Sequence, residues 1–315
     1  MNIAAHPITE ESLPCCNKLV ELVKTYAPET GVFDTPITGM EFVREDAPVI
    51  CAATVYEPGI YLLIQGELRI ALGDSEIHYR PMSYMIATVD LPVTATIMET
   101  SEEEPFLAIK LTVDARDVAD LVLKLGDEPH ANRSCCPCGL STAPVDYDIL
   151  DTMIRLAKLL KTPQHAPILE PLIKREVIYR ALVGEMGAKI RNFVKPDSHA
   201  HRITQAIEQI KQRYTEPLRV AELAGTVNMS ESTFYHSFKE VTRMSPVQYQ
   251  KKLRLHEARR LMLSDGLEAS TASYKVGYES PSHFSREYSR MFGAPPRADV
   301  AKLRQNHPSL AVALS

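Results

Sequence analysis

The chain has 315 residues, of which 45% are hydrophobic and 24% are charged, and its net charge is −5. This composition excludes wholesale disorder, and no apolar run approaches the ~20 residues that a membrane-spanning helix needs. Residues 1–10 lack the basic and apolar segments of a secretory signal, and the six cysteines suggest no disulfide framework, so we expect a cytoplasmic protein with no membrane partner.

Residues 31–113 are rich in short apolar or β-branched runs. The runs cover residues 49–56, 60–64, 67–72, 84–89, 94–98 and 106–113. Turn signals such as Glu57-Pro58-Gly59 and Gly73-Asp74 separate them. Many short strands at about ten-residue spacing predict a sandwich or a small barrel, and a barrel of about eight strands has room inside for one small ligand.

Three cysteines, Cys135, Cys136 and Cys138, lie within four residues after the predicted strands, close to Arg133. Positive charge nearby favours the thiolate, which is the form that reacts with oxidants and electrophiles. This pattern suggests a thiol-based sensor. The alternative is a loop that happens to carry cysteines, and a metal site is a weaker variant because no clear fourth ligand is in view.

Two amphipathic helices are predicted between residues 144 and 193. The first carries an apolar stripe formed by Ile149, Met153, Leu156, Ala157 and Leu160. The second is predicted to follow Pro171, with one side formed by Leu169, Leu172, Ile173, Val177 and Ala181. These helices either cover the barrel or pair with a second copy of the chain. Residues 196–201 are polar and are predicted to be a linker, in which His199 and His201 without further ligands are solvated.

A helix-turn-helix pattern follows the linker. A short helix at 220–224 and a turn at 225–228 precede Ser230, a good N-cap for a helix that runs to Val241 or Thr242. Phe234, Phe238 and Val241 share its inner face. The outer face is polar and consists of Glu231, Ser232, Tyr235, His236 and Lys239. The major groove of DNA accepts one α-helix, so polar side chains on such a face can reach base edges.

The same pattern recurs about 50 residues later. A short helix at 269–276 and a turn at 277–279 precede Ser280, which caps a helix beginning at Pro281. Phe284, Tyr288 and Phe292 share the inner face of that helix. The outer face includes Pro281, Ser282, Ser285 and Arg286. Between the two units, residues 246–264 are predicted to form one long basic helix, which would fix the separation of the two readers along the DNA.

Charge is distributed unevenly along the chain. Residues 197–315 contain 17 basic and 12 acidic side chains, a net charge of +5, whereas residues 1–196 have a net charge of −10. A basic module attached to an acidic one suggests that the C-terminal part meets a polyanion. The alternative is an ordinary solvated surface.

The C-terminal residues resemble the AraC/XylS family of transcription regulators. The resemblance rests on residues 273–288 and 291–296, together with 229–232, 238–239, 245–249 and 254–255. It implies a monomeric DNA reader with two recognition helices. By position in the motif, the residues that would face bases are Ser232, Tyr235, His236, Ser282, Ser285 and Arg286. The first helix departs from the commoner arginine at one of these places.

The N-terminal half is similar to the AraC-type N-terminal domain at residues 29–31, 61–66, 91–93 and 171–176. That resemblance implies a cupin-like barrel that senses a ligand or drives dimerisation. The metal-binding form of the barrel needs clustered histidines, and only His78 lies within the predicted strands. We therefore expect no metal and no cofactor.

These observations predict an α+β multidomain chain. A cupin-like sensor barrel (1–143) is followed by a helical dimerisation or cover region (144–195), a linker (196–201) and an all-α DNA-binding domain (202–315) with helix-turn-helix units at about 219–242 and 269–292. The predicted function is a sequence-specific transcriptional regulator, with double-stranded DNA, RNA polymerase, a small-molecule effector and a second copy as partners.

The alternative function is a small-molecule enzyme barrel with a tethered DNA-binding domain. Against it, the nearest nucleophile elbow, at Gly73-Asp74-Ser75, ends in Ile77 rather than glycine, and His256 lacks the second histidine of a zinc protease helix. We therefore expect no enzyme activity.

Overall fold

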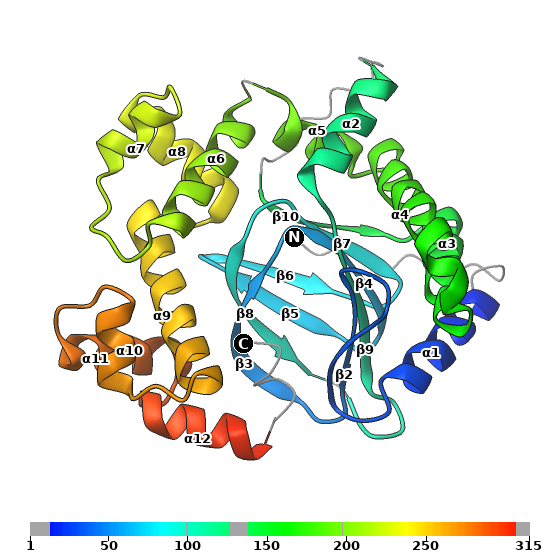
Figure 1. Ribbon diagram of the computed structural model, residues 1–315, viewed down its shortest axis with the longest axis horizontal. Coiled ribbons are helices and arrows are strands. Elements are labelled where there is room, and N and C mark those ends of the chain that lie inside the picture. The colour runs from blue at the N-terminus through cyan, green and yellow to red at the C-terminus, as the bar shows by residue number, and fades with distance from the viewer. Residues whose placement is uncertain (1–12, 99, 127–137, 197, 307–315) are drawn as a thin grey trace.

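Two antiparallel β-sheets face each other at the centre of the molecule (Figure 1). The structure, a computed structural model, describes residues 13–98, 100–126, 138–196 and 198–306. The six-stranded sheet has the order β1-β2-β9-β4-β7-β10, and the four-stranded sheet has the order β3-β8-β5-β6. The strands are β1 (Gly31–Asp34), β2 (Met40–Glu45), β3 (Val49–Tyr56), β4 (Gly59–Gln65), β5 (Leu68–Leu72), β6 (Ser75–Tyr79), β7 (Ser83–Ala87), β8 (Leu91–Ile97), β9 (Phe106–Thr112) and β10 (Leu140–Pro144).

The burial of each strand follows from its place in these sheets. In β5, Leu68, Ile70 and Leu72 are buried while the two residues between them are exposed, because only one face of this strand meets the barrel interior. In β4, six consecutive residues from Gly59 to Ile64 are buried. This strand lies within the six-stranded sheet, which is covered by helices outside and by the second sheet inside.

Helices cover the outer face of the six-stranded sheet. They are α1 (Leu13–Tyr26), α2 (Ala115–Leu125), α3 (Tyr147–Lys158), α4 (Ala166–Val183) and α5 (Gly187–Val194), with short 3-10 turns at Leu159–Lys161 and Pro163–His165. Buried side chains of these helices and of β2, β4, β7 and β9 form one hydrophobic cluster. The buried faces of the helices at 144–193 therefore cover the barrel, which is one of the two roles that the sequence leaves open for them.

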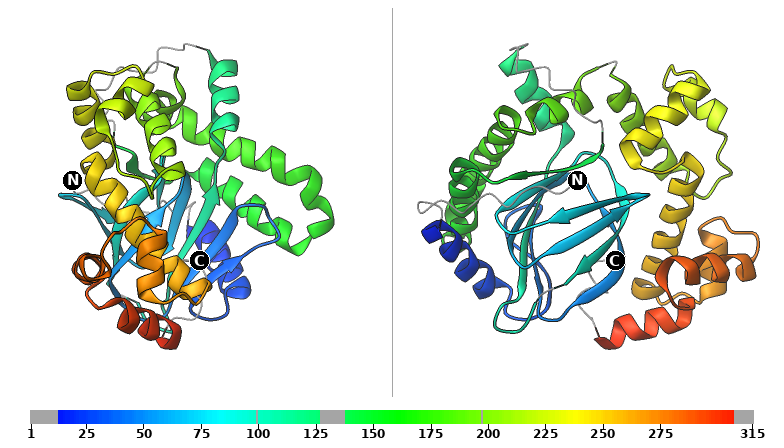
Figure 2. Two further views of the ribbon diagram at one scale, coloured as in Figure 1. Left: turned by 60° about the vertical axis from the view of Figure 1, so that its left-hand side comes forward. Right: turned by 180° about the vertical axis from the view of Figure 1, so that it is seen from behind.

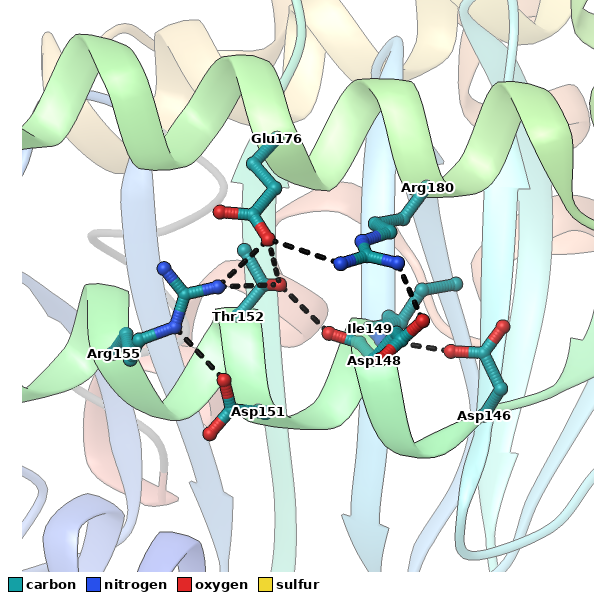
Figure 3. A network of polar contacts seen from close by, with 8 residues as sticks. All are labelled: Asp146, Asp148, Ile149, Asp151, Thr152, Arg155, Glu176 and Arg180. Carbon is teal, nitrogen blue, oxygen red and sulfur yellow. Dashed lines mark hydrogen bonds and ion pairs between the residues drawn. The ribbon is translucent and has the colours of Figure 1, made fainter.

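A charged network ties α3 to α4 on the solvent side (Figure 3). Glu176 of α4 accepts hydrogen bonds from Arg155 of α3 at 2.8 Å and from Arg180 at 3.4 Å. Arg180 also reaches back to Asp148 on α3, and Arg155 bonds Asp151 at 2.8 Å. These partly exposed ion pairs fix how far the two helices are shifted along each other. The hydrophobic contact beneath them does not specify that position.

The structure corrects the predicted second helix in two ways. The helix α4 begins at Ala166, five residues before Pro171, because one proline removes only a single backbone donor and buried side chains lie on both sides of it. In addition, Leu169 and Leu172 do not share the buried side with Ile173 and Val177. They are 40% and 61% exposed and point away from the barrel core.

Seven helices form the C-terminal region within the described residues. They are α6 (His199–Gln212), α7 (Val220–Thr226), α8 (Glu231–Thr242), α9 (Pro246–Ser264), α10 (Ala269–Lys275), α11 (Pro281–Phe292) and α12 (Pro296–Asn306). The helix α6 begins inside the stretch predicted as a linker, and α7 extends through Gly225, which was predicted in the turn. The region packs against the four-stranded sheet, on the side of the barrel opposite α1, α3 and α4 (Figures 1 and 2).

Candidate nucleic-acid interface and effector cavity

The helix α8 presents a polar face to solvent. Ser230 accepts a hydrogen bond from the Thr233 amide at its start, and Arg243 ends it in the left-handed conformation, with φ of 59°. Phe234 and Phe238 are fully buried on the inner side. The outer side is exposed at each predicted position, namely Glu231, Ser232, Tyr235, His236 and Lys239. The His236 ring lies 3.4 Å from Glu240, one turn along the helix.

The helix α11 has the same design. Ser280 caps its start through the His283 amide, and Gly293 closes its end with φ of 78°. Phe284 and Tyr288 are buried beneath it. On the outside, Ser282 and Arg286 are exposed, whereas Pro281 and Ser285 are partly buried.

Two further polar side chains on α11 were missed by the sequence prediction. His283 and Arg290 are exposed on the same helix, and His283 lies 3.7 Å from Glu287. Arg290 follows Arg286 by one helical turn, so the sequence spacing indicates that the two side chains share a face. The exposed basic character of α11 is therefore greater than the predicted set indicates.

The basic residues of α9 do not form an exposed stripe, contrary to the impression given by its sequence. Arg254 donates hydrogen bonds to the carbonyl oxygens of Tyr214, Glu216 and Gly277, and so joins three segments of the domain. Lys251 pairs with Glu287 of α11 at 2.9 Å. None of the five basic side chains of α9 is fully exposed. This helix works as an internal brace between the two helix-turn-helix units.

The first helix-turn-helix unit shares a hydrophobic core with the barrel. Phe238 and Tyr249 belong to the same buried cluster as Leu91 and Val93 of β8. The Tyr249 hydroxyl donates to the carbonyl oxygen of Asp90 at 2.9 Å, and Lys211 pairs with the Asp90 carboxylate at 2.7 Å. The barrel therefore seats this unit through both apolar and polar contacts.

Two barrel turns also touch the end of α8. The Gly139 amide donates to the carbonyl oxygen of Val241 at 2.9 Å. Gly73, in the turn between β5 and β6, has φ of +58°, and a Cβ atom placed on it would lie 1.9 Å from the carbonyl oxygen of Arg243. Only glycine allows this approach of the two backbones.

The second unit meets the barrel through a buried polar group. Arg259 of α9 pairs with both carboxylate oxygens of Asp299 at 2.8 and 2.9 Å and stacks 4.3 Å from the centre of the Phe292 ring. The Tyr288 hydroxyl of α11 donates to the same carboxylate at 2.7 Å. The remaining guanidinium nitrogen donates to the carbonyl oxygen of Ala53 at 3.2 Å. β3 is an edge strand of the four-stranded sheet, so its outer side is open to a bond of this kind.

The barrel encloses a cavity of about 180 Å³ between its two sheets. Each strand from β1 to β9 contributes to its lining, which includes Tyr56, Tyr61, Tyr79 and several small side chains. Among the described residues, no group of three or more His, Cys, Asp or Glu side chains is placed to hold a metal ion. His78 lies on β6 and pairs at 3.8 Å with Glu76, outside the cavity lining.

Comparison with known proteins assigns both halves of the chain. Residues 36–189 match the N-terminus of AraC-type transcriptional regulators, and residues 223–301 match a helix-turn-helix domain. The chain belongs to the AraC family of transcriptional regulators. The family is non-enzymatic, so the alternative of an enzyme barrel is not retained.

Curated relatives of this AraC-family chain agree with that assignment. It is 28% identical over 144 residues to the HTH-type transcriptional regulator ArgR of Pseudomonas aeruginosa, covering 46% of this chain and 44% of that one. It is 31% identical to CdhR of the same organism over 34% of this chain and 32% of that one. The match thus spans less than half the length of these relatives.

The fold is similar to that of ToxT from Vibrio cholerae. The apo structure of a ToxT variant aligns with a TM-score of 0.58 at 12% identity, covering 85% of this chain and 98% of that one. The two-domain architecture, a β-sheet domain with helices followed by an all-helical region, is therefore confirmed. No helix within the described ranges is both long and apolar enough to cross a membrane.

The cysteine cluster falls largely outside the described residues. Cys135 and Cys136 lie there, so the structure places only Cys138, a half-buried free thiol that packs against the core shared by the barrel and the first unit. A different thiol pair, Cys15 and Cys16, lies on α1. Burial raises the pKa of Cys16, and Cys15 beside it adds to the effect. The Cys16 thiol is therefore not activated for reaction.

Proposed function

We propose that this chain is a transcriptional regulator that binds double-stranded DNA through α8 and α11 and changes that binding when a small molecule occupies the barrel. The observation that carries the proposal is the pair of capped helices with buried aromatic inner faces and exposed polar outer faces. A polar helix face that protrudes from a rigid scaffold fits the major groove, where each base pair offers a distinct pattern of donors and acceptors.

Base contacts are proposed for the exposed residues on these faces. In α8 they are Ser232, Tyr235 and His236, flanked by Glu231 and Lys239. In α11 they are Ser282, Ser285 and Arg286, with Pro281 at the start of the helix. Arg286 is exposed. Within the described residues, its Nε donates to the carbonyl oxygen of Ser282 at 3.3 Å. Its guanidinium is therefore available for a bidentate contact to guanine.

The test is a comparison of specific and random DNA. We expect the full chain to bind its own upstream region more tightly than random DNA in mobility-shift titrations across a salt series. Arg286→Ala should weaken specific binding by about 1–3 kcal/mol and relax the preference at one base pair, with little change on random DNA. Arg116→Ala, an exposed arginine on α2, is the control. Equal losses on both DNAs would remove Arg286 from the base-reading set.

Strand β3 supports a route from the cavity to the second unit. Thr54 and Tyr56 line the cavity, and the carbonyl oxygen of Ala53, between Thr54 and Ala52 on the same strand, accepts the hydrogen bond from Arg259. A ligand that displaces β3 would lengthen or break that bond and shift the population of DNA-competent molecules. Contact with RNA polymerase would then convert DNA binding into a change in transcription.

A homodimer is proposed through the outer face of α4. Ile168, Leu172, Tyr179 and Val183 are exposed by 71%, 61%, 40% and 39% and recur at helical spacing. Sedimentation of the full chain should give a dimer that Leu172→Glu converts to a monomer, whereas Lys158→Glu on α3 leaves it unchanged. A monomeric wild-type chain at micromolar concentration would contradict this proposal.

A thiol response of Cys135, Cys136 and Cys138 remains a prediction. Its support is the position of Cys138 beside Gly139, whose amide bonds the last turn of α8. Replacing all three cysteines with serine should abolish any change in DNA binding caused by an aldehyde or an oxidant. An unchanged response in the triple variant would rule out this loop as the sensor.

A further inference from the structure

The cavity is built around three cross-strand pairs of β2 and β9. Glu41 lies opposite Lys110, Val43 opposite Ala108, and Glu45 opposite Phe106. All six side chains line the cavity, because alternate residues of a strand point to the same face. The small Ala108 in the middle, with Ala52 and Ala95 of the opposing sheet, leaves the space that a ligand would fill.

At one end of this row, the single lysine of the cavity lining is already paired. Lys110 donates to Glu41 at 3.0 Å and to Glu57 at 2.9 Å. Burial alone would lower the pKa of Lys110, but its hydrogen bonds to Glu57 and Glu41 outweigh the burial and raise the pKa. With two carboxylates on one ammonium, this end of the cavity has no free positive charge to offer an anionic ligand.

At the other end, one carboxyl oxygen has no hydrogen-bond partner within the part of the chain that the structure describes. The Glu45 side chain is buried, at 2% exposure, and its Oε2 has no hydrogen-bond partner among the described residues. Burial, with a smaller contribution from Asp46, raises the pKa of Glu45 to about 7. Burying an acceptor without a donor costs free energy. Such an acceptor indicates a site where a bound ligand supplies the donor.

Aromatic rings surround the rest of the space, and the hydroxyls of Tyr61 and Tyr79 are occupied. The Tyr61 hydroxyl donates to the carbonyl oxygen of Glu57 at 2.9 Å, and the Tyr79 hydroxyl is within 2.5 Å of the Tyr61 carbonyl oxygen. The rings of Tyr56 and Tyr61 meet edge to face with centroids 4.8 Å apart. The cavity offers a ligand aromatic and aliphatic surface and the unpartnered Oε2 of Glu45, and aromatic faces also favour cations.

We propose that the cavity binds a small apolar molecule carrying one cationic amine, with the ammonium paired to Glu45 and the apolar body beside Ala108. The inference deepens the proposed function, because it gives the chemical class of the effector. It also separates this chain from its fold relative ToxT of Vibrio cholerae, which has been crystallised with an unsaturated fatty acid bound. The acidic side chains that line this cavity disfavour a ligand carboxylate and favour a ligand cation.

Calorimetric titration of the full chain with three probes of the same shape tests the proposal. The probes are 2-phenylethylamine, 2-phenylethanol and phenylacetate. We expect the amine to bind at least ~10-fold more tightly than the alcohol, and the carboxylate to bind most weakly. In Glu45→Gln the amine and the alcohol should bind within ~3-fold of each other, because a neutral amide removes the charge and keeps the shape. Glu67→Gln, an exposed position, is the matched control.

A second variant ties the binding to the cavity itself. Ala108→Leu fills the space between Glu41 and Glu45, so all three probes should lose binding while the thermal unfolding transition remains cooperative. Tighter binding of phenylacetate than of the amine, no binding of the amine to the wild type at millimolar concentration, or an unchanged amine preference in Glu45→Gln would each overturn the proposal.

Mobility shifts with the upstream DNA separate this inference from the proposed function. Amine binding that depends on Glu45 but leaves DNA binding unaltered would support the ligand class and refute the effector role. Specific DNA binding without amine binding would support the proposed DNA-binding function and refute the ligand class.

Discussion

The two helix-turn-helix units are alike in design but are attached to the barrel in different ways. The first shares a continuous hydrophobic core with β8 and β5, whereas the second has its own core and reaches the barrel through the bond from Arg259 to Ala53. Apolar burial is strong and insensitive to direction, while a hydrogen bond depends steeply on geometry. We infer that the barrel holds the first helix-turn-helix unit rigidly and that small movements of β3 change the position of the second unit.

Removing the central side chain of the first attachment gives the largest expected effect. Tyr249 is fully buried, packs edge to face on Phe238 and bonds Asp90. Tyr249→Ala should lower the free energy of unfolding by about 3–5 kcal/mol, as for other large aromatic truncations in a core. Urea unfolding of the full chain measures this. Tyr274→Ala, at a 60% exposed position, should change it by less than about 0.5 kcal/mol.

Weakening the buried ion pair that holds Arg259 in the second attachment should cost less and act locally. Asp299→Asn removes one charge of the buried pair and leaves Arg259 partly uncompensated, which should cost about 2–3 kcal/mol. Amide hydrogen exchange should then rise in α11 and α12 while α8 stays protected. Equal loss of protection in α8 would show that the two units do not differ in their attachment.

The smallest of these effects depends on pH. His256 on α9 is buried against Phe292, and burial, together with Arg259 and Lys252, lowers its pKa to about 3. The unfolded chain binds a proton at His256 below pH 6.5 and the folded chain does not, so stability falls as pH drops from 6.5 towards 3. Between pH 6.5 and 5 this loss is about 2 kcal/mol.

The variant His256→Leu isolates the contribution of His256 to the pH dependence of stability. Glu45 acts in the opposite direction, because its raised pKa gives stability that is lost as pH rises from 4.5 through about 7. The difference between the wild type and His256→Leu, measured by urea unfolding at pH 6.5 and pH 5, cancels the Glu45 effect. An identical pH dependence in the two proteins would mean that His256 protonates without cost in the folded chain.

Local signals made the DNA-binding helices predictable almost to the residue. The helix 246–264 begins with a capping box of Ser245 and Gln248, and the helix that starts at Pro281 ends before a glycine in the left-handed conformation. Each of these signals lies within a few residues of the feature that it determines. The boundaries therefore needed no knowledge of the fold.

Features that depend on distant residues were not predicted. The strands β1, β2, β6 and β10 and the helices α1 and α2 were not identified individually, although α1 carries an apolar stripe at Leu19, Leu22 and Val23. The partner of Arg259 lies 206 residues away in the sequence, so its basic side chain was counted as surface charge. Likewise, nothing local distinguishes Glu45 from the solvated glutamates, because its isolation comes from strands that pair only in the folded barrel.

The turn at Gly73 constrains how this protein can evolve. Any substitution there adds at least one carbon atom where the carbonyl oxygen of Arg243 already stands, so a single codon change would push the barrel away from the end of α8. Such a mutation changes neither the cavity nor the outer face of the helix. The barrel and the first DNA-binding unit of this chain are therefore fitted to each other at this turn, and a barrel exchanged into the chain would need a turn that leaves room for the end of α8.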